Sequence, residues 1–213
     1  VVDGVVMGRS GMAFAQMMDL KGVEVLRGPQ GMLFGKNASA GVVHILTNDP
    51  TPEFEANIGV RVEDDMYRVE GAVSTPLGDQ FGLRIAAMYS DTDPYVDNRH
   101  SSGDLNDSED KAVRGKLRWE PSDTLEFKLS ADYAESDGDC CQPTPRVTTD
   151  LPVPIFGIQE ELIAPVTGSD DNFDTNVGAD VFQDSDMSGV SLEVNWDIND
   201  FVITSITAAR EWN

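Results

Sequence analysis

A two-residue alternation of apolar and polar side chains runs through most of the chain from Phe54 onward. This period sends successive side chains to opposite faces of a β-strand, so each segment of about ten residues predicts one strand. In the first segment, Phe54, Ala56 and Ile58 share one phase, and Glu55 shares the other with Asn57. Comparable segments lie at 54–63, 67–74, 81–90, 113–120, 125–133 and 190–197, and a less clean one lies at 201–212. The fold class is therefore predicted to be mainly β, with about seven strands.

Charge placement separates the two faces of these strands. Alternation alone does not decide whether water or lipid covers the apolar face, because a soluble β-sandwich also alternates. In the first six segments, however, the cations all fall on the polar phase: Arg61, Arg68, Arg84, Arg114, Lys116, Arg118 and Lys128. One face of the predicted sheet is thus free of Lys and Arg, which favours lipid as its neighbour.

Aromatic residues and connection lengths support a membrane-spanning sheet. Bulky aromatic residues gather near strand ends, with Phe54, Phe81, Trp119, Trp196 and Phe201 near one set of turns and Tyr67, Tyr89 and Tyr133 near the other. The turns at 76–80, 121–124 and 198–200 are short, whereas the connections at about 91–111 and 136–188 are long. The connection at 64–65 is short although it falls on the long-loop side. Aromatic girdles with alternating short turns and long loops are typical of a transmembrane antiparallel β-barrel.

Composition excludes several classes of function. A net charge of −23 opposes binding to nucleic acid, which requires clustered cations. No run of about 18 apolar residues is present for a spanning helix. The chain opens on Val1 with no initiator Met or signal segment, so we expect a piece of a longer protein. We find no arrangement of nucleophile, base and acid, so we expect neither an enzyme nor a cofactor.

The first fifty residues carry a long, ordered set of motifs. Val2-Asp3-Gly4-Val5 is followed by the run Val23-Glu24-Val25-Leu26-Arg27-Gly28-Pro29-Gln30-Gly31-Met32-Leu33-Phe34-Gly35-Lys36-Asn37-Ala38 and by Gly41-Val42-Val43-His44-Ile45-Leu46-Thr47. This segment resembles the C-terminal half of the plug domain of TonB-dependent outer-membrane receptors. It departs from the family pattern at Met32, Ala40 and His44, where the family usually has Thr or Ser, Gly and Asn.

The resemblance implies a domain division and a function. Residues 1–50 would be the C-terminal part of the plug, with short β runs at 1–7, 22–26 and 41–47, and residues 51–213 the N-terminal part of a barrel. A plugged lumen implies about 22 strands, of which about seven lie here. The whole receptor would take up a scarce ligand, most often a ferric siderophore, across the bacterial outer membrane. Its partners would be outer-membrane lipid and the TonB–ExbB–ExbD complex, which acts on a TonB box that precedes these residues.

Three groups of plug residues are candidates for function. The Gly-flanked segment after the first β run would reach the ligand through Met7, Arg9, Ser10 and Met12, with the Arg9 guanidinium suited to an anionic chelate. Arg9 could instead cap a turn or pair with an Asp of the wall. By resemblance, Glu24 and Arg27 would latch the plug to the barrel, unless they are ordinary solvated charges. Gly28, Gly31, Gly35 and Gly41 would permit tight turns and close backbone approach.

Other motifs predict no chemistry. Gly31 and Gly35 are too close for a phosphate loop, and Asn37 replaces the Ser or Thr that binds magnesium. The acidic run from Asp170 lacks the turn glycine and the bidentate Glu of a calcium loop, and the two histidines are far apart, so no metal site is expected. Cys140 and Cys141 could form a vicinal disulfide, pair elsewhere or do neither. The long loops hold half of the 38 acidic residues, either as a vestibule for cationic ligands or as a solvated surface.

Two alternatives from other classes stay open. A passive porin-type barrel would share the girdles but would lack the plug motifs. A secreted β-sandwich binding module would share the alternation but would expose a mixed surface on both faces. The sequence does not identify the ligand.

Overall fold

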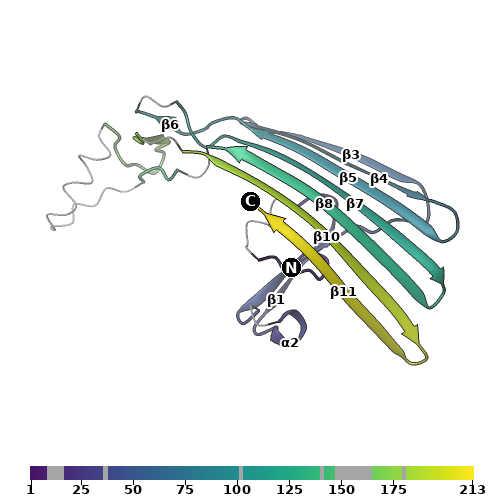
Figure 1. The fold of residues 1–213 in the computed structure, drawn as a ribbon. Coiled ribbons are helices and arrows are strands. Elements are labelled where there is room, and N and C mark those ends of the chain that lie inside the picture. Colours follow the sequence, from purple (N-terminus) through teal and green to yellow (C-terminus); the bar gives the residue numbers. More distant parts are fainter. Residues whose placement is uncertain (9–16, 36–37, 101–102, 140–141, 147–164, 179–180) are drawn as a thin grey trace.

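The computed structural model describes residues 1–8, 17–35, 38–100, 103–139, 142–146, 165–178 and 181–213. One antiparallel sheet of seven strands, here called the wall, dominates the fold (Figure 1). Its strands, in chain order, are β3 (Glu55–Val62), β4 (Met66–Pro76), β5 (Phe81–Thr92), β7 (Ser108–Ser122), β8 (Leu125–Gly138), β10 (Gln183–Ile198) and β11 (Phe201–Trp212). Each strand pairs with the next wall strand in the chain, so the wall is a meander. All seven predicted strands are confirmed.

The strands reach farther toward the long loops than the alternation predicts. The long connections span 93–107 and 139–182, because β7 begins at Ser108 and β8 continues to Gly138. Backbone pairing continues there through the partners Asp110 and Ser136. The apolar phase ends earlier than the strands do, as expected where the side chains on both faces of a strand meet water. The period that marks a half-buried strand is therefore lost before the strand itself ends.

Burial in the wall is the reverse of that in a soluble sheet. Apolar side chains on one face are exposed, including Ile58 at 78% and Ile85 at 49%. On the other face, charged and hydroxyl side chains are buried: Ser74, Arg84, Ser90, Arg114, Lys116 and Asp132. Arg84 is only 3% exposed. This inversion is expected when lipid covers the apolar face and a plug covers the polar one. Among the described residues, no helix is long and apolar enough to cross a membrane.

Aromatic rings mark both ends of the apolar face. Near the short turns, Trp119 stacks between Phe81 and Phe127, with ring centroids 5.8 and 5.0 Å away. Toward the long loops, the rings of Tyr67 and Tyr89 lie 5.6 Å apart. The two predicted aromatic groups therefore lie on neighbouring strands, at opposite ends of the lipid-facing surface.

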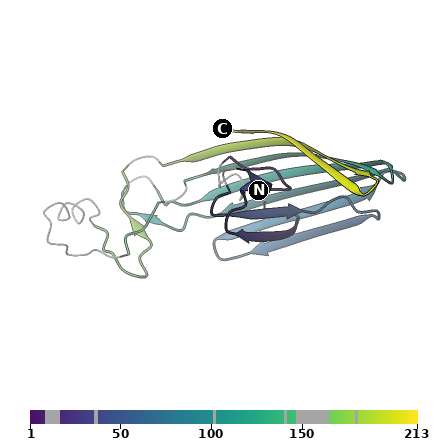
Figure 2. The same ribbon diagram turned by 90° about the horizontal axis from the view of Figure 1, so that it is seen from below.

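A small β-hairpin lies on the concave side of the wall (Figures 1 and 2). It consists of β1 (Leu20–Arg27) and β2 (Gly41–Thr47), joined through the single-turn helix α2 (Gly31–Phe34). We refer to residues 1–49 as the plug segment. The helix was not predicted. Gly31, expected in a tight turn, instead begins this helix, whereas Gly28 and Gly35 have positive φ angles of 84° and 80°.

The β run predicted at 1–7 is not a strand. Val2 and Val5 bond to each other through both backbone groups, at 2.9 and 2.8 Å, around a turn at Asp3 and Gly4. Both central residues have positive φ, 44° and 78°, as the type I′ hairpin turn favoured by an Asp-Gly pair requires. The chain therefore reverses at Asp3, and this segment meets β2 through an isolated bridge between Val2 and Ile45.

Candidate functional site

Three arginines of the wall hold three consecutive residues of the plug segment. Arg68 of β4 donates to the Met17 carbonyl at 2.6 Å, and Arg114 of β7 donates to the Met18 carbonyl at 3.2 Å. Between these strands, Arg84 of β5 makes two 2.6 Å bonds to the Asp19 carboxylate. We call this set the arginine clamp. It fixes the backbone at the start of β1 against three neighbouring strands.

Asp19 also joins the clamp to the end of the hairpin. Asn48 donates its side-chain amide to the Asp19 carboxylate at 2.9 Å and its backbone N–H to the Asp19 carbonyl at 3.0 Å. Burial raises the pKa of the Asp19 carboxyl, but the hydrogen bonds from Arg84 and Asn48 and the charges of Arg84 and Arg114 lower it by more. The pKa therefore lies below its ordinary value, and the carboxylate stays ionised in its pair with Arg84.

A second ion-pair centre holds the junction between the plug segment and β3. The Asp49 carboxylate binds Lys116 of β7 at 3.0 Å and Lys128 of β8 at 3.1 Å. Burial raises the pKa of Asp49, but the charges and hydrogen bonds of Lys116 and Lys128 lower it by more, so the pKa lies below its ordinary value. Next along the chain, the Thr51 N–H donates to the buried Ser74 hydroxyl at 2.8 Å.

The Asp3–Gly4 turn makes the third attachment. The Asp3 carboxylate accepts hydrogen bonds from the Thr47 N–H and hydroxyl at 2.9 and 2.6 Å, and lies 3.1 Å from Lys116. A side chain on Gly4 would lie 2.6 Å from Ile206 of β11, so glycine allows the turn to approach that strand. The plug segment thus contacts the wall from β4 to β11.

A cavity of about 370 Å³ with a mixed polar and apolar lining separates β2 from β8, β10 and β11. Its lining includes Thr47, Asp49, Lys128, Ser191, Glu193 and Asn195. Charges of both signs and several hydroxyl groups make this space suited to water. Among the described residues, no group of three or more His, Cys, Asp or Glu side chains could hold a metal ion.

The two long loops are fastened to each other beyond the wall. β6 (Asp97–Asn98) pairs in parallel with β9 (Asp174–Thr175), and Arg99 donates to both oxygens of Asp174 at 2.9 and 2.8 Å. The Asn98 side chain bonds to the Val177 N–H and carbonyl, each at 3.1 Å. The described parts of the two loops therefore form one structured unit.

The structure describes some of the predicted site residues, and others lie outside its described part. Met7 packs against a buried cluster that contains Met18, whereas Arg9, Ser10 and Met12, like Cys140 and Cys141, lie outside the described residues. Glu24 and Arg27 are exposed on β1, and Glu24 lies 3.4 Å from the His44 ring nitrogen Nδ1. That contact is internal to the plug segment, so the latch role of these two residues stays a prediction.

His44 bridges β2 to the Asp3–Gly4 turn. Its Nε2 accepts a hydrogen bond from the Gly4 N–H at 3.3 Å while Nδ1 faces Glu24, as in a neutral ring protonated on Nδ1. The edge of the ring also meets Phe34 of α2, with centroids 5.6 Å apart. His44 thus links β2, the Asp3–Gly4 turn and α2.

Sequence reasoning missed Asp3, Asp19 and Asp49. A usable signal was present, because the polar phase of the wall carries Arg84, Arg114 and Lys116 on adjacent strands facing a lumen. Buried cations require anionic partners. The carboxylates that flank the β runs of the plug segment are the groups within reach.

Comparison with known proteins agrees with this geometry. Residues 1–42 match the family model described as the TonB-dependent receptor plug domain. The pesticin receptor of Yersinia pestis is 33% identical over 111 residues, which cover 50% of this chain and 16% of the receptor. The ferripyoverdine receptor of Pseudomonas aeruginosa is 27% identical over 129 residues, which cover 60% of this chain and 15% of that receptor.

Solved structures show the same fold. The ferric yersiniabactin uptake receptor of Yersinia pestis matches with a TM-score of 0.77 at 22% identity, covering 100% of this chain and 31% of that receptor. The ferric-catecholate import receptor of E. coli matches with a TM-score of 0.77 at 17% identity. The match covers 99% of this chain and 31% of that receptor. The chain thus spans less than a third of the receptors that it matches.

The relatives are receptors and importers rather than enzymes, and they include a receptor of the outer membrane. The predicted family, fold class and outer-membrane location are therefore confirmed. By sequence over residues 1–42 and by fold, the chain resembles the TonB-dependent outer-membrane receptors.

Proposed function

We propose that this chain belongs to a receptor that imports a ferric siderophore through the outer membrane with energy relayed by the TonB–ExbB–ExbD complex. The attachment of the plug segment to the inner face of the wall supports this proposal most directly. The buried Asp19–Arg84 pair and the partly buried Asp49–Lys116 pair lie on the face of the wall that a passive pore would leave open to solute. The relatives named for ferripyoverdine and ferric yersiniabactin support the ligand class.

The two alternatives fit the structure less well. A passive porin-type barrel has no need of a hairpin tied to its inner face. A secreted β-sandwich would not bury Arg84, Arg114 and Lys116 while exposing Ile58 and Ile85. The exposed apolar face supports a membrane location for the wall.

Uptake in cells tests the transport proposal. A strain that lacks the full-length gene would be supplied with ⁵⁵Fe-loaded yersiniabactin, enterobactin or pyoverdine under iron limitation. We expect uptake of at least one complex to fall and to return on complementation. Deletion of TonB should abolish the same uptake, because active import needs the inner-membrane energy source. Uptake that depends on the gene but persists without TonB would instead support a passive pore.

The ligand contacts are a second part of the proposal. We assign Met7, Arg9, Ser10 and Met12 to the ligand-facing surface of the plug, with Arg9 attracting an anionic chelate through charge-assisted hydrogen bonds. Arg9→Ala in the complete receptor should weaken binding of whichever ⁵⁵Fe complex the wild type imports, without lowering the amount of assembled barrel. Lys21→Ala, which removes an exposed cation from β1, is the matched control. Equal loss of affinity in both variants would count against a specific role for Arg9.

A further inference from the structure

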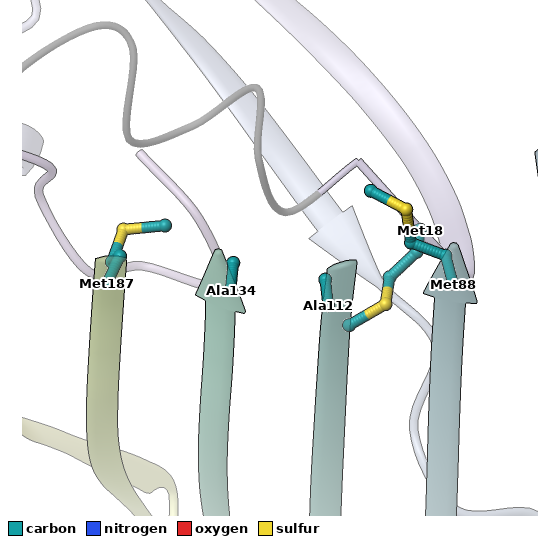
Figure 3. Packing of buried hydrophobic residues seen from close by; sticks show 5 residues of the cluster. All are labelled: Met18, Met88, Ala112, Ala134 and Met187. Carbon is teal, nitrogen blue, oxygen red and sulfur yellow. The ribbon is translucent and has the colours of Figure 1, made fainter. Parts of the chain in front are cut away.

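On the inner face of the wall, one row of side chains that runs across the strands is apolar. The rows on either side of it, here called levels, contain polar side chains. Met88, Ala112, Ala134 and Met187 are register partners across β5, β7, β8 and β10. The four side chains form one row, with Met18 of the plug segment next to Met88 (Figure 3). All five residues are buried, and Met18 and Met187 are each 2% exposed.

The neighbouring levels on the same four strands have a different chemistry. Toward the long loops the partners are Ser90, Asp110, Ser136 and Ser185, and toward the short turns they are Ala86, Arg114, Asp132 and Gly189. On the short-turn side, Asp132 also binds Arg210 of β11 at 2.7 Å. Water can find hydrogen-bonding partners at both of these levels but none among the side chains of the row between them.

The arginine clamp places Met18 in this row. The Met18 carbonyl is bonded by Arg114, and its two chain neighbours are held by Arg68 and Arg84. Its side chain therefore has little freedom to leave the wall. Ala112 and Ala134 supply small side chains that permit close approach, and thioether side chains are flexible enough to fill the remaining irregular space.

We propose that Met18, held by the arginine clamp next to Met88 at one end of the row (Figure 3), forms with Met88, Ala112, Ala134 and Met187 a hydrophobic seal that blocks water and small ions between the plug segment and this part of the wall. Apolar constrictions stop permeation because water leaves them. The barrier between the plug segment and this part of the wall is thereby assigned to one row of side chains. It does not depend on the identity of the imported ligand.

Ion conductance of the purified full-length receptor in planar bilayers tests the seal. Met18→Gln keeps the length of the side chain but brings hydrogen-bonding groups into the row, so the conductance should rise above the wild-type baseline. Met18→Leu keeps the row apolar and should stay at that baseline. Met32→Gln makes the same chemical change at a fully exposed position in α2 and serves as the matched control.

Met187→Gln makes the same chemical change on the wall side of the seal and should also raise the conductance. This second variant keeps the test informative if Met18→Gln fails to assemble. Assembly would be checked for each variant by heat-modifiable electrophoretic mobility. Baseline conductance in correctly assembled Met18→Gln or Met187→Gln would overturn the proposal. An equal rise in Met32→Gln would also overturn it, because the leak would then reflect general loosening of the plug. No ligand is needed, so failure of this test is distinct from failure of the transport proposal.

Discussion

Asp19 of the plug segment and Arg84 of β5 form a bidentate ion pair, with side chains only 9% and 4% exposed. Both oxygens of the carboxylate are used, and Arg84 has a further contact with Glu55 at 3.4 Å. Removing one partner of such a buried pair leaves a charge without full compensation, which is costly in a region with little water. The pair is therefore the strongest single attachment between the plug segment and the wall.

Asp19→Asn should weaken docking of the plug segment by about 3–5 kcal/mol, the usual cost of breaking a buried ion pair from one side. Asn tolerates the positive φ of 50° at this position, so the backbone should not be strained. The measurement is the guanidinium chloride midpoint of plug release, followed by a fluorophore on Val43→Cys in the full-length receptor. Glu63→Gln breaks the exposed Arg61–Glu63 pair and should cost less than about 1 kcal/mol. Similar shifts in both variants would contradict this assignment.

Plug docking should weaken in acid. The pKa values of Asp19 and Asp49 are lowered in the docked state from an ordinary value of 3.8. The undocked state then binds protons more readily, so the stabilisation is complete well above pH 3.8 and is lost as the pH falls through the lowered pKa values. The same midpoint should therefore fall steeply below about pH 4. The double variant Asp19→Asn/Asp49→Asn should show a flatter pH profile, and a profile as steep as that of the wild type would place the titrating groups elsewhere.

A charge on the apolar face should prevent assembly of the wall. Ile85→Arg places a guanidinium on an exposed position of the apolar face of β5, where the cost at the bilayer midplane is about 2–4 kcal/mol. Leu77→Arg, in the exposed turn after β4, should cost about 0–1 kcal/mol because the interface is hydrated. The fraction of heat-modifiable barrel in outer-membrane preparations measures both. A yield from Ile85→Arg as high as that from Leu77→Arg would contradict the assignment of Ile85 to a lipid-covered face.

Thiol labelling of intact cells should reveal the orientation. In a receptor without its native cysteines, Asp104→Cys and Asp171→Cys in the exposed long loops should react with an impermeant maleimide, whereas Ser122→Cys near a short turn should not. All three should react after the cells are lysed, which controls for local accessibility. Labelling of Ser122→Cys alone in intact cells would reverse the proposed topology.

The wall could be predicted from the sequence because its signal is local. Alternation along each segment is enough to locate β3, β5 or β8, and each strand pairs with the next wall strand in the chain. β6 and β9 could not be found in this way, since two-residue strands have no measurable period. Their pairing depends on loop contacts such as Arg99–Asp174, which join positions far apart in the chain.

From the sequence, the type of contact between the plug segment and the wall could be predicted, but the partner residues could not. A buried cation such as Lys116 requires an anionic partner, but its neighbours Asp3 and Asp49 are identified only when the register of the hairpin against the wall is known. The family resemblance predicts a latch at Glu24 and Arg27, because both residues lie within a family motif. Asp19 stands outside that motif, at a position where a positive φ turns the chain into β1.

The meander connection of the wall also has a consequence for the order of assembly. Each wall strand can pair as soon as the next one is made, so the sheet can grow hairpin by hairpin from contacts that are close in the sequence. The plug attachments are of another kind. Asp19–Arg84, Asp49–Lys128 and Met18–Arg114 join residues separated by 65, 79 and 96 positions. Closing such long loops is slow compared with adding a hairpin, so the plug segment, although synthesised first, should reach its final position only after β8 is in place.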